Sequence, residues 1–288
     1  MPEFGMIESF SADQLEHAVN LISQADGLIV AAGAGMGVDS GLPDFRGKEG
    51  FWKAYPALGR DQVDFYRIAC PEAFRTQPKR AWGFYGHRLN LYRATQPHDG
   101  FEILKRWGAG MAHGCAVFTS NVDGQFQKAG FDQAVMEECH GSIHHLQCLT
   151  PCCNAIWPAD ELVPEVNAEQ CLLLSAIPSC PHCGGMARPN VMMFNDWEWL
   201  EHRQAQQAAR MARWLAGVSR PVVVEIGAGT AIPSVRRFSQ RILHEFGGQL
   251  IRINPREFNV PTTQDVGLAS GASHALAALD RVMRSSQR

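Results

Sequence analysis

The sequence predicts an α/β protein built on a mainly parallel sheet, with a helical insert and a small cysteine-rich insert. Short apolar runs that fit buried strands alternate with amphipathic helical segments, which is typical of βαβ units. Two stretches break this alternation. Residues 37–104 are rich in aromatic residues and polar turns, and residues 141–189 contain paired cysteines and several prolines.

Each element follows from its residue pattern. The first helix is expected over residues 11–25, because Ser11 and Gln14 form a capping-box pattern and apolar residues recur at helical spacing. A short buried strand over residues 27–33 follows it. Further buried strands are expected at residues 115–119, 134–136, 222–227 and 250–254. Further helices are expected at residues 101–107, near 197–216, at 234–246 and at 274–283.

Charge and composition exclude several classes of protein. The net charge of −3 gives no electrostatic footprint for nucleic acid or an anionic membrane. No apolar run reaches the ~18 residues of a membrane span. The first ten residues, MPEFGMIESF, lack the basic start and apolar core of a signal peptide. We therefore expect a soluble cytoplasmic protein without a nucleic-acid or membrane partner.

Paired cysteines indicate a metal site in the second insert. Three residues separate Cys148 from Cys152, two separate Cys180 from Cys183, and 27 residues separate the pairs. Each short spacing lets two thiolates reach one ion, and two such pairs complete a tetrahedral Zn²⁺ site with no open position. The expected ion is therefore structural, with Cys153 as an alternative ligand to Cys152. Scattered buried thiols are the competing interpretation.

A glycine turn directly follows the first predicted strand, at Gly33, Ala34 and Gly35. Glycines let the backbone approach a diphosphate, and N–H groups at a helix start stabilise its charge. The spacing of a dinucleotide-binding fingerprint is not kept, because the next glycine, Gly37, comes one residue early. An ordinary dehydrogenase is therefore disfavoured, and a tight strand-to-helix turn explains the glycines equally well.

Polar side chains also end two other predicted strands. In TSNVDG, residues 119–124, Asn121 and Asp123 are two positions apart and project to one side of an extended chain. They face a ligand, or they form an Asx turn that caps the next helix, which is the more frequent use of such residues. His140 follows the strand at 134–136, and an imidazole there suits acid–base chemistry, although a lone histidine is more often structural.

Together these motifs resemble the sirtuin family, the NAD-dependent protein lysine deacylases. GAGMGVDSGLPDFRG is similar to the glycine turn and SGIPDFRG loop of that family, and TSNVDG is similar to its TQN-[IV]-DG segment. CHGS, RPNVMMFND and RINP are similar to its His-Gly, RP-x-V-x-x-FGE and Ile-Asn elements. The cysteine pairs occur in the expected order, and the resemblance covers nearly the whole chain.

The resemblance implies a Rossmann-like fold with two inserted modules. Residues 1–36, 105–140 and 190–288 would form the NAD-binding domain, residues 37–104 the cofactor loop and helical module, and residues 141–189 the zinc-binding module. The residues that the resemblance assigns to NAD binding are Gly33, Ala34, Gly35, Asp44, Phe45, Arg46, Ser120, Asn121, Asp123, Gly227 and Asn254.

The resemblance also implies the chemistry. Nicotinamide leaves NAD, and the carbonyl oxygen of an acyl-lysine attacks the ribose carbon C1′. His140 accepts a proton relayed from a ribose hydroxyl, with Asn121 as the second catalytic residue. Water then releases lysine and O-acyl-ADP-ribose. The partner is an acylated lysine peptide that lies as a strand between the zinc module and the main domain. The residues from Val191 to Phe194 are candidates for the edge that it pairs with and for the acyl tunnel.

Tyr85 and Arg88 resemble the Tyr-x-x-Arg element of sirtuins that remove succinyl and malonyl groups. On a helix the two side chains share a face at i, i+3, and a guanidinium can bind a carboxylate through two hydrogen bonds. The alternative interpretation is an exposed arginine on an amphipathic helix.

The sequence departs from the family pattern at four places. Gly37 stands where most sirtuins carry Ser or Thr, and Ser120 stands where they carry Gln. Asn195 and Asp196 replace a Gly-Glu pair, and GAGT at residues 227–230 replaces a Gly-Thr-Ser loop. The first hypothesis is an NAD-dependent lysine deacylase. The alternative on the same scaffold is a mono-ADP-ribosyltransferase or NAD glycohydrolase, and the third hypothesis is a non-enzymatic binding module.

Overall fold

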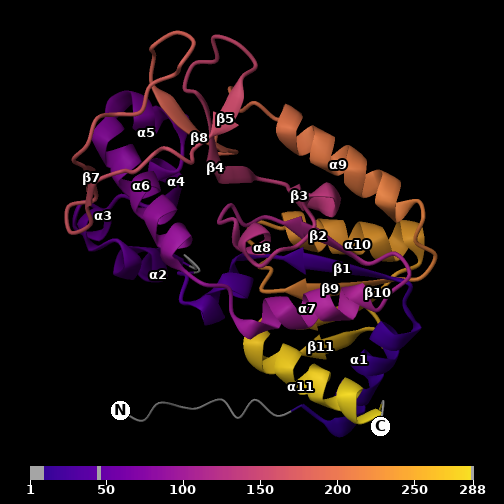
Figure 1. Ribbon diagram of the computed structural model, residues 1–288. Coiled ribbons are helices and arrows are strands. Elements are labelled where there is room, and N and C mark those ends of the chain that lie inside the picture. The colour runs from indigo at the N-terminus through magenta and orange to yellow at the C-terminus, as the bar shows by residue number, and fades with distance from the viewer. Residues whose placement is uncertain (1–9, 44–46, 287–288) are drawn as a thin grey trace, which may run out of the picture.

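A six-stranded sheet with only parallel neighbours forms the centre of the protein (Figure 1). The computed structural model describes residues 10–43 and 47–286. The strand order β11–β10–β9–β1–β2–β3 reverses direction between β1 and β9, which is where open α/β sheets bind their ligands. The strands are β1 (Gly27–Ala32), β2 (Cys115–Thr119), β3 (Met136–Glu138), β9 (Pro221–Ile226), β10 (Gln249–Ile253) and β11 (Val266–Leu268).

Helices cover both faces of this sheet (Figure 1). Successive side chains of β1 point to opposite faces, so Leu28 and Val30 enter one hydrophobic cluster while Ile29 and Ala31 enter the other. The first cluster is completed by α1 (Ala12–Gln24), α7 (Asp99–Ala109) and α11 (Ala272–Ser286). The second is completed by α9 (His202–Leu215) and α10 (Ser234–Phe246).

The first insert, between β1 and β2, consists of short helices and one long helix. Proline occupies the first turn of three of them, where its missing N–H is not needed. The long helix α6 buries Trp82 and Phe84 in a third hydrophobic cluster. The helices are η1 (Ala34–Ser40, a 3₁₀ helix), α2 (Gly47–Ala54), α3 (Pro56–Arg60), α4 (Phe65–Ile68), α5 (Pro71–Thr76) and α6 (Pro78–Ala94).

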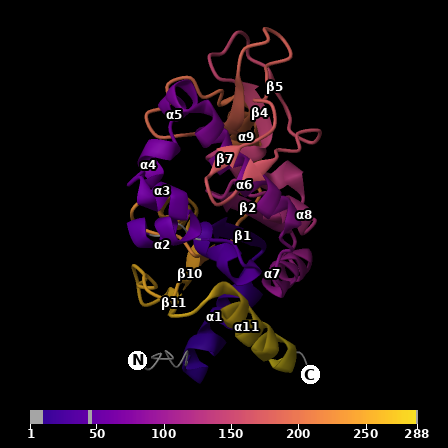
Figure 2. The ribbon, with the colours of Figure 1, turned by 90° about the vertical axis from the view of Figure 1, so that its left-hand side faces the viewer.

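The second insert contains a three-stranded antiparallel sheet, in the order β5–β4–β8, and a two-stranded sheet of β6 and β7. It shares the third cluster with α6, and the Trp82 indole donates to the Ala187 carbonyl at 3.0 Å. Figure 2 shows both inserts at the end of the molecule away from α1 and α11. The bounds are β4 (Gly141–Cys148), β5 (Ile156–Pro158), β6 (Val166–Asn167), β7 (Leu172–Leu173) and β8 (Ala187–Val191). Before it lie α8 (Gln125–Lys128) and η2 (Gln133–Val135, a 3₁₀ helix).

The predicted fold class is confirmed, and so is the capping box of α1, in which Ser11 and Gln14 exchange two hydrogen bonds of 3.1 Å. The strand expected at 134–136 is wrong in position. Residues Gln133–Val135 form a 3₁₀ turn, because the Asp132 carboxylate accepts from the Ala134 N–H at 2.8 Å, and the strand starts at Met136. The domain boundaries stay predictions.

Two other differences concern the second half of the chain. The helix expected near 197 starts at His202, because the preceding residues are folded into a loop around a buried carboxylate. The insert sheet and the three-residue strand β11 were not expected from the sequence. Within the two described ranges, each helix is too short or too polar to traverse a lipid bilayer.

Candidate active site

A pocket of about 530 Å³ lies at the carboxyl ends of the central strands. Its wall combines the strand ends with residues of the first insert and of the segment that follows β8. It therefore brings together side chains that are far apart in the sequence. The predicted site residues that line it are Gly33, Ala34, Tyr85, Arg88, Ser120, Asn121, Asp123, His140, Val191, Phe194 and Gly227.

Of the five other residues predicted for this pocket wall, the structure describes two. Gly35 and Asn254 lie behind it, where the Gly35 N–H donates to the Gly227 carbonyl at 3.1 Å and the Asn254 amide donates to the Ala228 carbonyl at 2.9 Å. Asn254 is buried and holds the loop after β9, so its assignment as a direct NAD contact stays a prediction. The other three, Asp44, Phe45 and Arg46, lie outside the described residues.

Two glycine turns meet where the strand order reverses. A Cβ on Gly33 would lie 2.8 Å from the Gly227 carbonyl oxygen. Gly227 has a φ of +62°, and a Cβ there would lie 2.3 Å from the Cα of Gly35. Glycine is therefore required by the close approach of the two loops and, at Gly227, by the left-handed backbone. The ends of β1 and β9 thus pack closely together and line the pocket with small residues, glycine and alanine.

Asn121 and Asp123 extend from the end of β2 into the same pocket. The Asn121 amide donates to the Gly33 carbonyl at 3.0 Å, which links the loops after β1 and β2. Asp123 accepts from the Gln125 N–H at 2.9 Å, so it forms the Asx turn and lines the pocket as well. Burial raises the pKa of Asp123 to about 6, and the negative charge of Glu138 adds to the rise. This carboxyl group therefore changes charge just below neutral pH.

His140 follows β3 and turns its imidazole toward the pocket. Its Nε2 lies 3.0 Å from the hydroxyl of Ser234, and its carbonyl oxygen accepts from the Met192 N–H at 2.9 Å. Burial lowers the pKa of His140, while a hydrogen bond with the Ser120 backbone opposes that shift. The ring is therefore neutral near pH 7, which is the form that accepts a proton.

Tyr85 and Arg88 lie on α6 and line the pocket together. Arg88 is only 7% exposed, so the interpretation of an exposed surface arginine is wrong. Its Nε donates to the Tyr92 hydroxyl at 2.8 Å, and its guanidinium lies between 5.2 and 5.6 Å from the centroids of three aromatic rings. These rings orient a permanent positive charge inside an otherwise largely apolar chamber.

The segment after β8 forms one edge of the pocket mouth. The Phe194 N–H donates to the Ala69 carbonyl at 2.9 Å, which joins the segment to the first insert. Asp196 forms two hydrogen bonds with Arg188, of 2.6 and 2.9 Å, and both side chains are fully buried. Asn195 has a φ of +53°, a backbone region that asparagine tolerates better than most residues. The Asn195-Asp196 pair therefore makes a defined turn at this edge.

Four cysteine sulfurs of the second insert form a group within 4.8 Å of one another. The Sγ atoms of Cys148 and Cys183 are 3.7 Å apart, and those of Cys152 and Cys180 are 3.8 Å apart. A tetrahedral ion with Zn–S bonds of about 2.3 Å requires sulfur–sulfur distances of about 3.8 Å. The group therefore fits Zn²⁺. Cys153 lies outside the group, beside Cys152.

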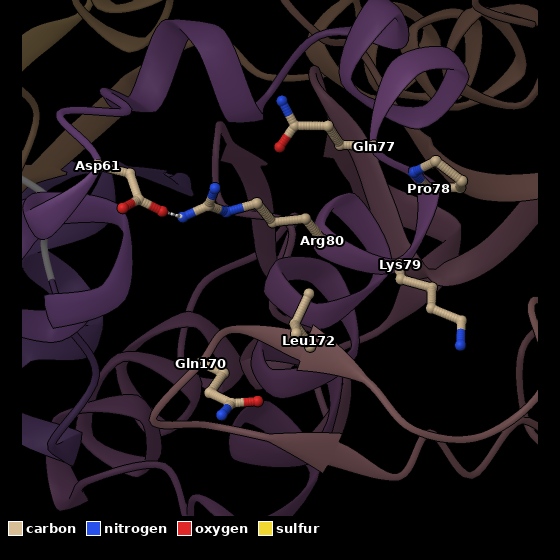
Figure 3. Close-up of a pocket in the computed structure, with 7 residues that line it drawn as sticks. All are labelled: Asp61, Gln77, Pro78, Lys79, Arg80, Gln170 and Leu172. Carbon is tan, nitrogen blue, oxygen red and sulfur yellow. Dashed lines mark hydrogen bonds and ion pairs between the residues drawn. The ribbon is translucent and has the colours of Figure 1, made fainter.

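A smaller hollow of about 380 Å³ opens at the start of α6 (Figure 3). Figure 3 shows Arg80 paired with Asp61 there, and the same guanidinium lies 3.4 Å from the Ala57 carbonyl oxygen. None of the predicted site residues that the structure describes lines this hollow. The described residues that the sequence predicts for catalysis, among them Asn121 and His140, line the larger pocket instead.

Sequence analysis missed several residues of the larger pocket. Tyr66 and Ile232 line it, and Ser234 contacts His140. Ser234 had a visible signal, because it follows Pro233 at the start of a predicted helix, close to the GAGT loop. Tyr66 had no such signal in the sequence, because its short helix α4 was not predicted.

Known proteins share both the sequence pattern and the fold. The model of the Sir2 family matches residues 33–222. NAD-dependent protein deacylase 2 of Pyrobaculum aerophilum is 30% identical over 264 residues, which are 91% of this chain and 93% of that protein. NAD-dependent protein deacylase of Aquifex aeolicus is 28% identical over 86% of this chain and 92% of its own length. A Sir2 homologue solved with NAD has the same fold, with a TM-score of 0.71, 24% identity and coverage of 95% of each chain.

Proposed function

The chain belongs to the Sir2 family, the sirtuins, and from this we propose that it is an NAD-dependent protein lysine deacylase. It transfers the acyl group of a modified lysine to the ADP-ribose part of NAD and releases nicotinamide. The observation that carries the proposal is the meeting of two bare glycine turns, the Asn121–Asp123 pair and His140 in one pocket.

NAD is the substrate that this pocket is proposed to bind, and it supplies an anomeric carbon that accepts the acyl oxygen when nicotinamide leaves. The turns at residues 33–35 and 227–229 contain only glycine and alanine, and small residues suit the close approach of a diphosphate. Asn121 and Asp123 provide an amide and a carboxyl group that can pair with a carboxamide. We assign Asp44, Phe45 and Arg46 to the same ligand on the basis of the family motif.

His140 is proposed as the general base. Its neutral ring stands in the wall of the pocket, where it can accept a proton from a ribose hydroxyl at Nε2. The enclosing apolar wall, which includes Val191, Met193 and Phe194, excludes water that would compete with the acyl oxygen. Binding both substrates in one chamber supplies the proximity that the transfer requires.

The zinc ion has a structural role in this proposal. Four thiolates fill a tetrahedral coordination shell and leave no position for a substrate. The ion instead connects the loop after β4 with the loop before β8, and β8 leads directly to the pocket edge at Val191. Metal binding therefore supports the shape of the substrate groove.

Tyr85 and Arg88 extend the proposal to acidic acyl groups. A buried guanidinium that lines the same chamber as His140 can bind the carboxylate of a succinyl or malonyl group. The Tyr85 hydroxyl can add a hydrogen bond, and burial raises the pKa of Tyr85, which keeps it a donor. Acetyl-lysine lacks the group that this arginine would bind, so acidic acyl-lysines are the preferred substrates.

The proposed location is the cytoplasm, where NAD is available and thiols stay reduced. All nine cysteines are free, and the zinc group needs thiolates rather than disulfides. The proposal assigns the protein an acylated lysine as its partner and gives no role to nucleic acid or to a membrane.

Incubation with NAD and a panel of acetyl-, malonyl- and succinyl-lysine peptides tests the function. We expect nicotinamide and O-acyl-ADP-ribose to form together, and only when an acyl peptide is present. His140→Ala should abolish peptide turnover and leave NAD binding measurable by calorimetry. Free ADP-ribose in the absence of peptide, or ADP-ribose attached to protein, would instead support the glycohydrolase or transferase alternative.

A further inference from the structure

The mouth of the pocket carries an exposed apolar rim. Tyr66, Met192 and Ile232 line the pocket and are nevertheless 57%, 42% and 43% exposed. Trp197, in the same segment as Met192, is 96% exposed. The Tyr66 ring packs against Phe194 with centroids 4.3 Å apart, so the rim continues into the pocket wall. Large apolar side chains gathered at a binding site indicate that a partner covers them.

Trp197 projects from a loop that is fixed on both sides. Asp196, which precedes it, is held by Arg188 in the buried ion pair. Glu198, which follows it, forms an ion pair with Arg75, and its carbonyl oxygen accepts from Gln147 at 2.8 Å. An aromatic side chain on a pre-ordered loop loses little conformational freedom when a partner covers it.

We propose that this apolar rim, formed by Tyr66, Met192 and Ile232 at the pocket, with Trp197 in the same segment as Met192, selects acyl-lysines that are flanked by large apolar or aromatic residues. The inference rests on the proposed function, because a protein chain that inserts an acyl-lysine into the pocket must cross its mouth. Met192 follows β8 and Ile232 follows β9, so the substrate chain is bounded by apolar side chains from two separate segments.

Two peptides with the same acyl-lysine test this inference, one with Leu and Phe beside the lysine and one with Ser and Gly. The wild-type protein should prefer the apolar peptide in kcat/KM by roughly tenfold or more, as expected when an apolar side chain is buried. Ile232→Ser and Met192→Ser should each reduce this preference, because both side chains line the pocket mouth. Val163→Ser is the control, because Val163 is 75% exposed and lies outside the pocket wall.

Three results are distinguishable. If the preference for the apolar peptide falls in the two rim variants and not in the control, the result supports substrate selection by the rim. Deacylation of both peptides at equal kcat/KM, or a preference for the apolar peptide that remains in both rim variants, contradicts substrate selection by the rim. Either result leaves the proposed function intact. A wild-type protein that turns over no acyl peptide contradicts the proposed function and the rim together.

A separate observation concerns the environment of His140. Its Nε2 lies 3.0 Å from the hydroxyl of Ser234, the first residue of α10. A hydrogen bond between the ring and the Ser120 backbone opposes the fall in the pKa of His140 that burial causes. The Ser234 hydroxyl can donate to Nε2 or accept from it, according to which ring nitrogen carries the hydrogen.

We infer that Ser234 is a positioning residue for the general base, again within the proposed function. The hydrogen bond with the Ser234 hydroxyl and the bond with the Ser120 backbone fix the orientation of the ring in the pocket wall. The backbone of α10 is anchored for this purpose, because Val235 and Phe238 pack in the sheet cluster that also contains Phe118. The rings of Phe118 and Phe238 stack with centroids 3.9 Å apart.

The test compares deacylation with the exchange of labelled nicotinamide into NAD in the presence of acyl peptide. Exchange reports only on steps before the base is needed. Ser234→Ala should lower deacylation by roughly tenfold, a fraction of what a general base contributes, and should largely spare exchange. Ser234→Thr should restore deacylation. Ser239→Ala is the control, because that buried serine of α10 bonds to the Val235 carbonyl.

An equal loss of deacylation and exchange in Ser234→Ala would show a general disturbance of α10 and overturn the positioning role. Unchanged deacylation would overturn it as well. A selective loss with rescue by threonine supports it.

Discussion

Replacement of Asp196 by alanine is expected to destabilise the protein strongly. Asp196 and Arg188 are both fully buried and form two charge-assisted hydrogen bonds, of 2.6 and 2.9 Å. The carboxylate also accepts from the backbone N–H groups of Met193 and Glu198, each at 3.2 Å. The variant leaves a guanidinium without its counter-ion in a dry interior, which costs about 3–5 kcal/mol. For a chain of this size that lowers Tm by roughly 6–20 °C.

Chemical denaturation, read by circular dichroism, measures this loss. The matched comparison is the double variant Arg188→Met with Asp196→Ala, which removes the unpaired charge. It should be more stable than Asp196→Ala alone, because replacing a whole buried ion pair is much less costly than breaking it. A loss below about 1 kcal/mol in the single variant, or a double variant less stable than the single one, would refute the reasoning.

Three further predictions concern acyl choice, metal and pH. Arg88→Met should lower kcat/KM for succinyl-lysine relative to acetyl-lysine by about 10–100-fold, the worth of a charge-assisted pair, and an unchanged ratio of the two rates contradicts it. Removal of zinc by a chelator should accelerate amide hydrogen exchange in β4 and β8 while β1 and β9 stay protected; uniform protection contradicts a metal-supported insert. Asp123 has a pKa of about 6 in the folded protein and about 3.9 when unfolded, so the folded state binds more protons between these values. The stabilisation from this proton is therefore present below pH 4 and lost as pH rises through 6, by up to about 3 kcal/mol. Between pH 4.5 and pH 7, the free energy of unfolding of the wild type should fall relative to that of Asp123→Asn. An equal difference between the two proteins at both pH values would contradict the prediction.

The positions of most predicted site residues were accessible from the sequence for a simple physical reason. Apolar runs mark buried parallel strands, and polar residues at their carboxyl ends must meet at one edge of the sheet. Gly33, Asn121 and Gly227 each follow such a run, and all three line the pocket. The cysteine spacing likewise predicted the sulfur group, because four thiolates that share one ion leave a strong pattern in the chain.

Other features depend on contacts between distant segments and leave no local pattern. Arg88 is buried because aromatic rings of its own helix surround the guanidinium in the pocket wall. The sequence pattern alone was equally consistent with an exposed arginine. The choice between Cys152 and Cys153 depends on the loop conformation and not on spacing. The loop at Asp196 replaced an expected helical start because its buried partner, Arg188, belongs to β8, which the sequence did not reveal as a strand.

The stoichiometry of the products tests the central claim most directly. The purified protein is incubated with NAD and one succinyl- or acetyl-lysine peptide, and all products are quantified by mass spectrometry. The deacylase mechanism requires nicotinamide, free lysine peptide and O-acyl-ADP-ribose in a ratio of one to one to one, and no products without peptide. Nicotinamide release that is independent of the peptide and yields plain ADP-ribose would contradict it.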